Sequence, residues 1–142
     1  MSDNVYLGNP NLKRANTQIQ FTEEQVVEFL KCKDDPVYFA LNYIKIVSLD
    51  EGEVPFKMYA FQEKLVRRFH ENRFNICKMP RQTGKSTTCV SYLLHYALFN
   101  ANVNIAILAN KASTARDLLN RLQFAYEKLP KCCLLYTSPS PR

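Results

Sequence analysis

Apolar side chains recur at helical spacing in several stretches of the chain and form short strand-like runs in two others. The helical stretches, where apolar positions repeat every three or four residues, are 21–32, 34–46, 60–72, 87–100 and 113–129. The strand-like runs are 73–79 and 101–110, and the second becomes continuously apolar, as buried parallel strands do. From residue 60 onward the order is helix, strand, helix, strand, helix. This order predicts the start of a doubly wound α/β domain.

Polar residues and prolines mark the predicted helix ends. Thr22 and Gln25 have the spacing of a capping box, in which two side chains bond free amide groups at a helix start. Asp35 can cap the following helix, and Pro36 suits its first position. Pro130 is expected to end the last helix.

The predicted helix over 60–72 has an apolar face and a basic face. Its expected core positions at fourfold spacing are Phe61, Leu65 and Phe69. Its other face carries Lys64, Arg67 and Arg68. This pattern predicts that the helix packs on one side and leaves cations in solvent on the other.

The composition is that of a folded, mildly basic protein. The chain has 142 residues, 46% of them hydrophobic and 23% charged, which fits one globular domain and excludes a disordered protein. The net charge of +6 suits a polyanionic partner such as nucleic acid or a nucleotide. A merely basic surface explains the same charge equally well.

No membrane or secretion signal is visible in the sequence. There is no run of 18 apolar residues. Residues 1–20 are polar, which predicts an extended or disordered arm, and they lack the apolar core of a signal peptide. The 5 cysteines include no Cys-x-x-Cys pair, so they read as thiols in a reducing compartment. We therefore expect a soluble, intracellular protein.

The last ten residues of the chain resemble a sequencing artefact. The ten residues "CLLYTSPSPR" match letter for letter the translation of a transposon-end sequencing adapter, whereas a natural Ser/Pro-rich tail is the alternative. We expect an N-terminal arm and helices over 1–53, the start of an incomplete α/β domain over 54–131, and adapter read-through over 132–142. On this interpretation the natural protein continues beyond Lys131.

The segment "PRQTGKS", residues 80–86, has the context of a phosphate-binding loop. It follows a predicted strand and opens a strongly periodic helix, which is the setting that this motif requires. Loop amides and the helix dipole would form an anion site, which Gly84 lets a phosphate approach closely. Lys85 would bridge the β- and γ-phosphates, and the Ser86 hydroxyl would ligate Mg²⁺. An ordinary basic helix start is the alternative.

The loop departs from the usual pattern at Met79, which stands five residues before Gly84, where glycine is normal. Arg81 lies inside the loop, where its guanidinium could face the γ-phosphate beside Lys85. Such an arginine would supply in cis the charge stabilisation of an arginine finger. A solvated loop charge is the alternative reading of Arg81.

At these residues the sequence resembles a known family. "PRQTGKSTT" is similar to the deviant Walker A loop of phage terminase large subunits, in which Arg-Gln precedes Gly-Lys. "VPFKMYAFQEKLVRRFHENRFNI" and "NVNIAILANKASTARDLLNRLQFAYEKLP" resemble the segments on either side of that loop. "YLGNPNLKRA" resembles the start of large terminases from contractile-tailed phages of the T-even-like group.

This resemblance implies that residues 54–131 begin an α/β P-loop NTPase domain of the terminase type, in the additional-strand, catalytic-glutamate (ASCE) class, preceded by helices. It implies an ATPase motor that packages double-stranded DNA into a procapsid. It also implies Mg²⁺, a portal protein, a small terminase subunit, a homo-oligomeric ring, and a place in the host cytoplasm and transiently at the portal, without secretion or a membrane.

The family's site residues carry over to matching positions of this chain. The implied nucleotide-binding residues are Gln62, Arg81, Gln82, Thr83, Gly84, Lys85, Ser86 and Thr87. Among them Arg81 and Lys85 are the expected catalytic residues, Ser86 the metal ligand, and Gln62 the reader of adenine. Tyr59 and Phe61 could stack on the base, although Phe61 fits the core stripe better. His95 is expected to be a packed or surface histidine.

The chain lacks the acidic Walker B segment and the nuclease domain that the family carries, because no hydrophobic run ending in two acids follows Pro130. We therefore expect little hydrolysis from this chain alone. Two alternatives remain: a helicase-like or DNA-repair P-loop ATPase, and a noncatalytic module that binds nucleic acid or protein.

Overall fold

A computed structural model describes residues 5–6, 9–13, 22–48, 52–130 and 133. The helices are α1 (Glu23–Asp34), α2 (Pro36–Tyr43), α3 (Ala60–Glu71), α4 (Lys85–Phe99) and α5 (Ala112–Glu127). The strands are β1 (Val5–Tyr6), β2 (Asn9–Lys13), β3 (Lys45–Ser48) and β4 (Gly52–Pro55). They form two separate antiparallel pairs, β1 with β2 and β3 with β4. The first pair lies within the predicted arm over 1–20.

Both predicted caps at the first two helices are confirmed. The Thr22 hydroxyl accepts from the Gln25 amide at 3.3 Å, and the Gln25 side chain accepts from the Thr22 amide at 3.1 Å. Asp35 accepts from the Val37 amide at 2.8 Å, directly after Pro36 opens α2. These contacts satisfy amide groups that a helix start leaves free.

The helix predicted over 34–46 is wrong beyond Tyr43. Ile44 ends α2 in an extended conformation, and the chain continues as β3, which pairs with β4. Gly52 adopts a φ of 72°, which glycine reaches without a steric penalty and which helps the chain enter β4. Ile46 and Val47 are β-branched and favour the strand over a further helical turn.

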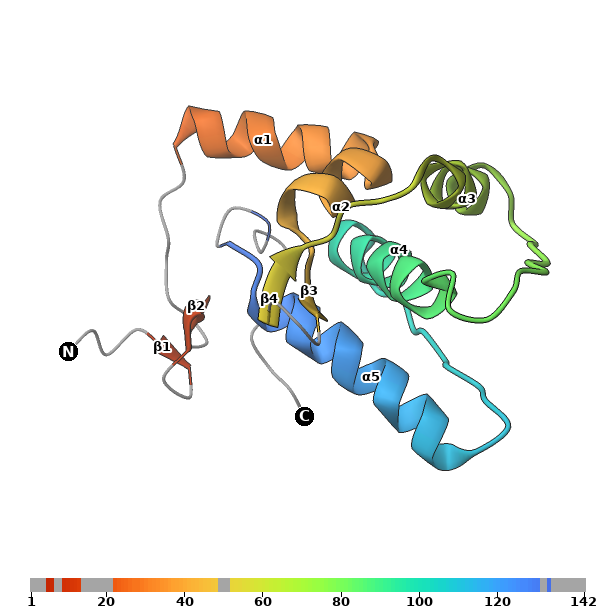
Figure 1. The fold of residues 1–142 in the computed structure, drawn as a ribbon. Coiled ribbons are helices and arrows are strands. Elements are labelled where there is room, and N and C mark those ends of the chain that lie inside the picture. Colours follow the sequence, from red (N-terminus) through yellow and green to blue (C-terminus); the bar gives the residue numbers. More distant parts are fainter. Residues whose placement is uncertain (1–4, 7–8, 14–21, 49–51, 131–132, 134–142) are drawn as a thin grey trace.

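The strands predicted over 73–79 and 101–110 are not formed in the part of the chain that the structure describes. Both runs lie in segments that carry no strand and extend from the helices as loops (Figure 1). Several of their apolar side chains are open to solvent: Phe74 is 82% exposed, Ile76 101% and Leu108 94%. A strand needs a partner for its backbone hydrogen bonds, and no described segment pairs with either run. The described residues therefore contain helices and small antiparallel pairs, without a parallel sheet.

The core lies where α2, α4 and α5 meet. Helix α4 packs against α2, α3 and α5, and it runs between α3 and α5 (Figure 1). The buried cluster consists of Cys32, Phe39, Ala40, Ile44, Phe56, Leu94, Leu98, Ala125, Leu129 and Cys133. Cys133 is the described residue of the segment 132–142, and it is buried in this cluster. Separate contacts between α3 and α4 hold these two helices next to each other.

The apolar face of α3 differs from the predicted stripe. Phe61 is 45% exposed, whereas Gln62 and Val66 are the buried residues of this helix. The helix is therefore rotated so that Gln62 faces the protein interior. Within the described residues, every helix is too short or too polar to cross a membrane.

Candidate functional site

The predicted phosphate loop ends where α4 begins. Gly84 has φ 72° and ψ 16°, a left-handed conformation, and Lys85 is the first residue of α4. The amide and hydroxyl of Thr88 both donate to the Gly84 carbonyl, at 2.9 and 3.0 Å. Gln82 also has a positive φ of 61°, which is uncommon for a side chain larger than glycine. Two left-handed residues in three positions bend the loop sharply onto the helix start.

Lys85 folds back across this loop. Its Nζ donates to the Met79 carbonyl at 2.6 Å and to the Pro80 carbonyl at 3.0 Å. A lysine ammonium has three donors, so one remains for another acceptor. The contact at Met79 uses a backbone oxygen, which every residue type has. This contact therefore does not require the glycine that the usual motif places there.

Thr83 and Pro80 close the loop from within. The Thr83 hydroxyl donates to the Pro80 carbonyl at 3.0 Å, so this carbonyl accepts from both Thr83 and Lys85. The Thr83 side chain is thus engaged with the loop itself. Together these contacts give the loop a defined shape, and a ligand that binds there meets partly preformed donors.

Gln62 reaches the loop from α3. Its Nε2 donates to the Thr83 carbonyl at 3.0 Å, and its Oε1 accepts from the Tyr59 amide at 2.9 Å. The side chain is only 3% exposed. A Cβ on Gly84 would lie 2.5 Å from the Gln62 Nε2. The residue that the resemblance assigns to adenine therefore lies beside the phosphate loop, with its amide engaged by the protein.

The remaining predicted site residues surround the helix start. Arg81, Gln82 and Ser86 are exposed, and Thr87 is half-buried. Among the described residues Arg81 has neither a hydrogen-bond nor an ion-pair partner, so its guanidinium is available to a ligand. Amides in the first turn of α4 have no acceptor within the helix, and the helix dipole adds positive potential there. The structure thus brings Arg81, Lys85 and free amides to one end of α4.

A cavity of about 320 Å³ lies beside this helix start. Lys85, Ser86 and Cys89 line one side of it, and apolar residues of 106–108 line the other. Its volume is at the lower end of the range typical of small-molecule sites. The polar wall lies at Lys85 and Ser86, the two residues that the sequence assigns to phosphate and metal.

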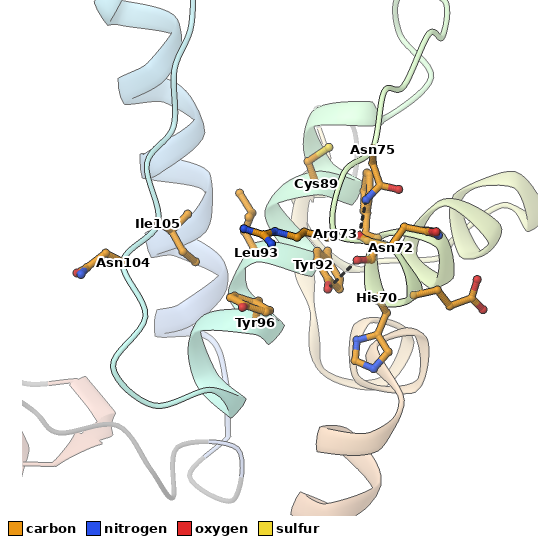
Figure 2. A pocket seen from close by; sticks show the side chains of 12 residues that line it. His70, Asn72, Arg73, Asn75, Cys89, Tyr92, Leu93, Tyr96, Asn104 and Ile105 are labelled. Carbon is orange, nitrogen blue, oxygen red and sulfur yellow. Dashed lines mark hydrogen bonds between the residues drawn. The ribbon is translucent and has the colours of Figure 1, made fainter.

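A larger cavity of about 670 Å³ lies farther along α4, and no sequence pattern predicted it. Figure 2 shows Asn72 and Asn75 on one side of it, Asn104 and Ile105 on the other, and the Arg73 side chain extending between them. Two hydrogen bonds shape its wall, from the Tyr92 hydroxyl to the Phe69 carbonyl at 3.1 Å and from Asn75 to the Asn72 carbonyl at 2.8 Å. None of the predicted site residues lines it.

Tyr59 and Phe61 form an exposed aromatic pair next to Gln62. Their rings are nearly parallel, at an angle of 8° with centroids 5.7 Å apart, and Tyr59 is 69% exposed. Flat aromatic faces open to solvent can stack on a nucleobase. Phe61, which the periodicity assigned to the core, therefore belongs to this exposed pair.

His95 is packed in the interior, as one of the two predicted alternatives has it. It is 2% exposed, and its Nε2 lies 2.8 Å from the Cys32 carbonyl, to which only a protonated Nε2 can donate. Its Nδ1 is buried without a partner among the described residues. Burial is the main cause that lowers the pKa of His95 to about 4. A neutral imidazole is therefore part of the core.

The donors around Lys85 suit a phosphate group better than they suit a bare metal ion. No cluster of three or more His, Cys, Asp or Glu side chains that could hold a metal is present in the described residues. The Ser86 hydroxyl is a single ligand, so a magnesium ion there would need water and phosphate oxygens for its other positions.

In a comparison with models of known protein families, no model matches the chain.

Proposed function

We propose that this chain binds the polyphosphate of ATP at the loop 79–86. The observation that carries the proposal is the position of Lys85, whose Nζ is held by the Met79 and Pro80 carbonyls at the N-terminus of α4. An ammonium held there, together with the free amides of the first helical turn, forms a compact cluster of donors. Such clusters bind phosphate groups through charge-assisted hydrogen bonds.

Each residue has a distinct part in the proposed site. Lys85 offers its third donor to a phosphate oxygen, and the Gly84 conformation keeps the backbone close without a Cβ in the way. Arg81 turns its free guanidinium to the terminal phosphate. Ser86 offers a hydroxyl to Mg²⁺, which in this class of site supplies charge neutralisation between phosphate oxygens.

We further propose that the chain is part of a viral DNA-packaging ATPase of the terminase large-subunit type. The sequence resemblance supports this, and so do the exposed cations of α3, which are Lys64, Arg67 and Arg68. Cations on one helix face attract a polyanion such as double-stranded DNA. In this proposal the ATPase works in the host cytoplasm, as a homo-oligomeric ring with a portal protein and a small terminase subunit.

This chain should bind ATP without turning it over at an appreciable rate. Hydrolysis needs a carboxylate that activates water, and the sequence has no hydrophobic run ending in two acids after Pro130. Steady release of phosphate from the purified chain would contradict this part of the proposal. Binding and hydrolysis are therefore tested separately.

The test is a calorimetric titration of the purified chain with ATP and Mg²⁺, next to the variants Lys85→Ala and Lys64→Ala. Losing one charge-assisted contact is worth about 1.5–3 kcal/mol, so Lys85→Ala should weaken binding roughly ten- to a hundredfold. Lys64→Ala removes the same charge from the exposed face of α3 and should leave the affinity nearly unchanged. Equal affinities of wild type and Lys85→Ala would refute the proposed site and favour a noncatalytic module.

A further inference from the structure

Gln62 connects α3 to the phosphate loop through both ends of its side-chain amide. The Oε1 accepts from the Tyr59 amide at 2.9 Å, and the Nε2 donates to the Thr83 carbonyl at 3.0 Å. Tyr59 precedes the first residue of α3, so the acceptor end is fixed to the helix start. The donor end is then aimed at a loop residue 21 positions along the chain.

This contact sets the direction of the peptide group between Thr83 and Gly84. In a trans peptide the carbonyl and the following N–H point in opposite directions. With the Thr83 carbonyl held toward Gln62, the Gly84 N–H is directed away from Gln62. An amide in the last loop position before α4 is one of the donors that a bound phosphate needs.

The close packing at Gly84 keeps the peptide in this orientation. A Cβ at that position would approach the Gln62 Nε2 to 2.5 Å, so the end of the glutamine side chain would have to shift away from the Thr83 carbonyl if residue 84 were not glycine. Gly84 also has the left-handed φ of 72°. The shape of the loop and the position of Gln62 therefore depend on each other.

The same geometry makes the Gln62 side-chain amide poorly accessible to a nucleobase. A glutamine that reads adenine presents an oxygen and an NH₂ group together to the base edge. Here each atom already makes one bond to the protein, and the residue is 3% exposed, so burial keeps the second proton and the second lone pair from a base. The exposed aromatic pair of Tyr59 and Phe61, by contrast, is open to a base.

We propose that Gln62 is a positioning residue of the phosphate loop, which orients the Thr83–Gly84 peptide for any polyphosphate ligand, and that it does not read the adenine base. This inference rests on the proposed function, because it assumes that the loop binds phosphate. The effect of Gln62 on binding is the same with or without a base on the ligand.

The experiment compares the affinities of ATP, GTP and inorganic tripolyphosphate for the wild type, Gln62→Ala and Gln62→Glu, by calorimetry. Glutamate is nearly isosteric and keeps the acceptor for the Tyr59 amide, but the ionised side chain cannot donate to Thr83. Gln123→Ala in α5 is the control, because Gln123 is exposed and bonds only Glu127. Both Gln62 variants should weaken all three ligands by one common factor, about tenfold.

Loss of ATP affinity alone, with GTP and tripolyphosphate unchanged, would overturn the positioning role and restore base reading. An unchanged affinity for every ligand in both Gln62 variants would also overturn it. If the wild type binds neither ATP nor tripolyphosphate, the proposed function itself fails. The two failures are therefore distinguishable.

A measurement on the wild type covers the case in which the variants fold poorly. The Gln62 side-chain NH₂ gives its own NMR signals, and these report on its hydrogen bond to the Thr83 carbonyl. A positioning residue predicts that these signals move equally when tripolyphosphate or ATP is added at saturation. A shift that occurs only with ATP contradicts the proposal.

Discussion

The Lys85 Nζ lies 2.6 Å from the carbonyl oxygen of Met79, so the lysine of the Gly-Lys-Ser sequence bonds the residue that departs from the usual motif. The contact needs only a backbone oxygen, which methionine supplies as well as glycine does. Met79 therefore does not prevent the loop from closing around Lys85.

Arg81→Ala should weaken binding of tripolyphosphate without destabilising the protein. Arg81 is exposed and has no partner among the described residues, so its removal breaks no contact and should change the free energy of unfolding by no more than about 0.5 kcal/mol. The affinity should fall severalfold at low salt and less at high salt, because the guanidinium acts through charge. Calorimetry at two salt concentrations measures this. An affinity that does not change at either salt concentration would identify Arg81 as a solvated loop charge.

Gly84→Ala should be more damaging than the matched change Gly52→Ala. Both glycines have a φ of 72°, so both substitutions incur the left-handed penalty of about 1–2 kcal/mol. Among the described residues, the new methyl group at Gly84 meets the Gln62 Nε2 at 2.5 Å, whereas one at Gly52 meets no atom within 4 Å. Denaturant unfolding should show the larger loss for Gly84→Ala, which alone should lose tripolyphosphate binding. Equal losses in the two variants would speak against the close contact with Gln62.

Tyr59→Ala should reduce the affinity for ATP and leave that for tripolyphosphate unchanged. The hydrogen bond to Gln62 uses the Tyr59 backbone amide, so the substitution removes the exposed ring and retains that contact. Stacking of a base on an aromatic ring is worth about 1–3 kcal/mol, which corresponds to roughly a five- to hundredfold weaker affinity. Phe74→Ala is the control, since Phe74 is an exposed aromatic residue on another segment. A loss shared by ATP and tripolyphosphate would show that Tyr59 supports the loop.

His95 should make the protein less stable as the pH falls from about 6.5 toward 4. Burial lowers the pKa of His95 in the folded state to about 4, below the unperturbed value of 6.5, so the unfolded chain binds more protons in this interval. The contribution is fully present above pH 6.5 and is lost as the pH falls, with a slope approaching about 1.4 kcal/mol per pH unit. Denaturant unfolding at several pH values measures the slope.

The comparison of His95→Phe with His70→Ala isolates this effect. Phenylalanine fits among the neighbouring rings of Phe39 and Phe99 and cannot titrate, so the part of the slope due to His95 should vanish. His70 is exposed and lies near His95, at 6.1 Å between ring centroids, and its removal should leave most of the slope. A slope that persists in His95→Phe would place the titrating group elsewhere.

Local signals in the sequence predicted the features that depend on neighbouring residues. The cap at Thr22 and the cap at Asp35 were predictable, because each involves residues within a few positions of one another. The helix after the loop was predicted over 87–100, and α4 begins two residues earlier, at Lys85. The grouping of Arg81, Gly84 and Ser86 around Lys85 was predictable for the same reason, because these residues are neighbours in the sequence.

Features that depend on distant segments could not be predicted in this way. The runs 73–79 and 101–110 have strand-like composition, but a strand forms only with a partner, and the described residues provide none. Gln62 has a polar side chain on a helix, and its burial against Thr83 results from packing between segments 21 residues apart. Periodicity alone assigned Phe61 to the core, whereas the rotation of α3 on α4 buries Val66.

The most direct test of the phosphate site is a crystal structure of this chain with ATP and Mg²⁺. The proposal predicts a phosphate oxygen about 2.7–2.9 Å from the Lys85 Nζ, with other phosphate oxygens facing the amides at the start of α4. Density for the polyphosphate on the basic face of α3, at Lys64, Arg67 and Arg68, with the loop 79–86 empty, would contradict it.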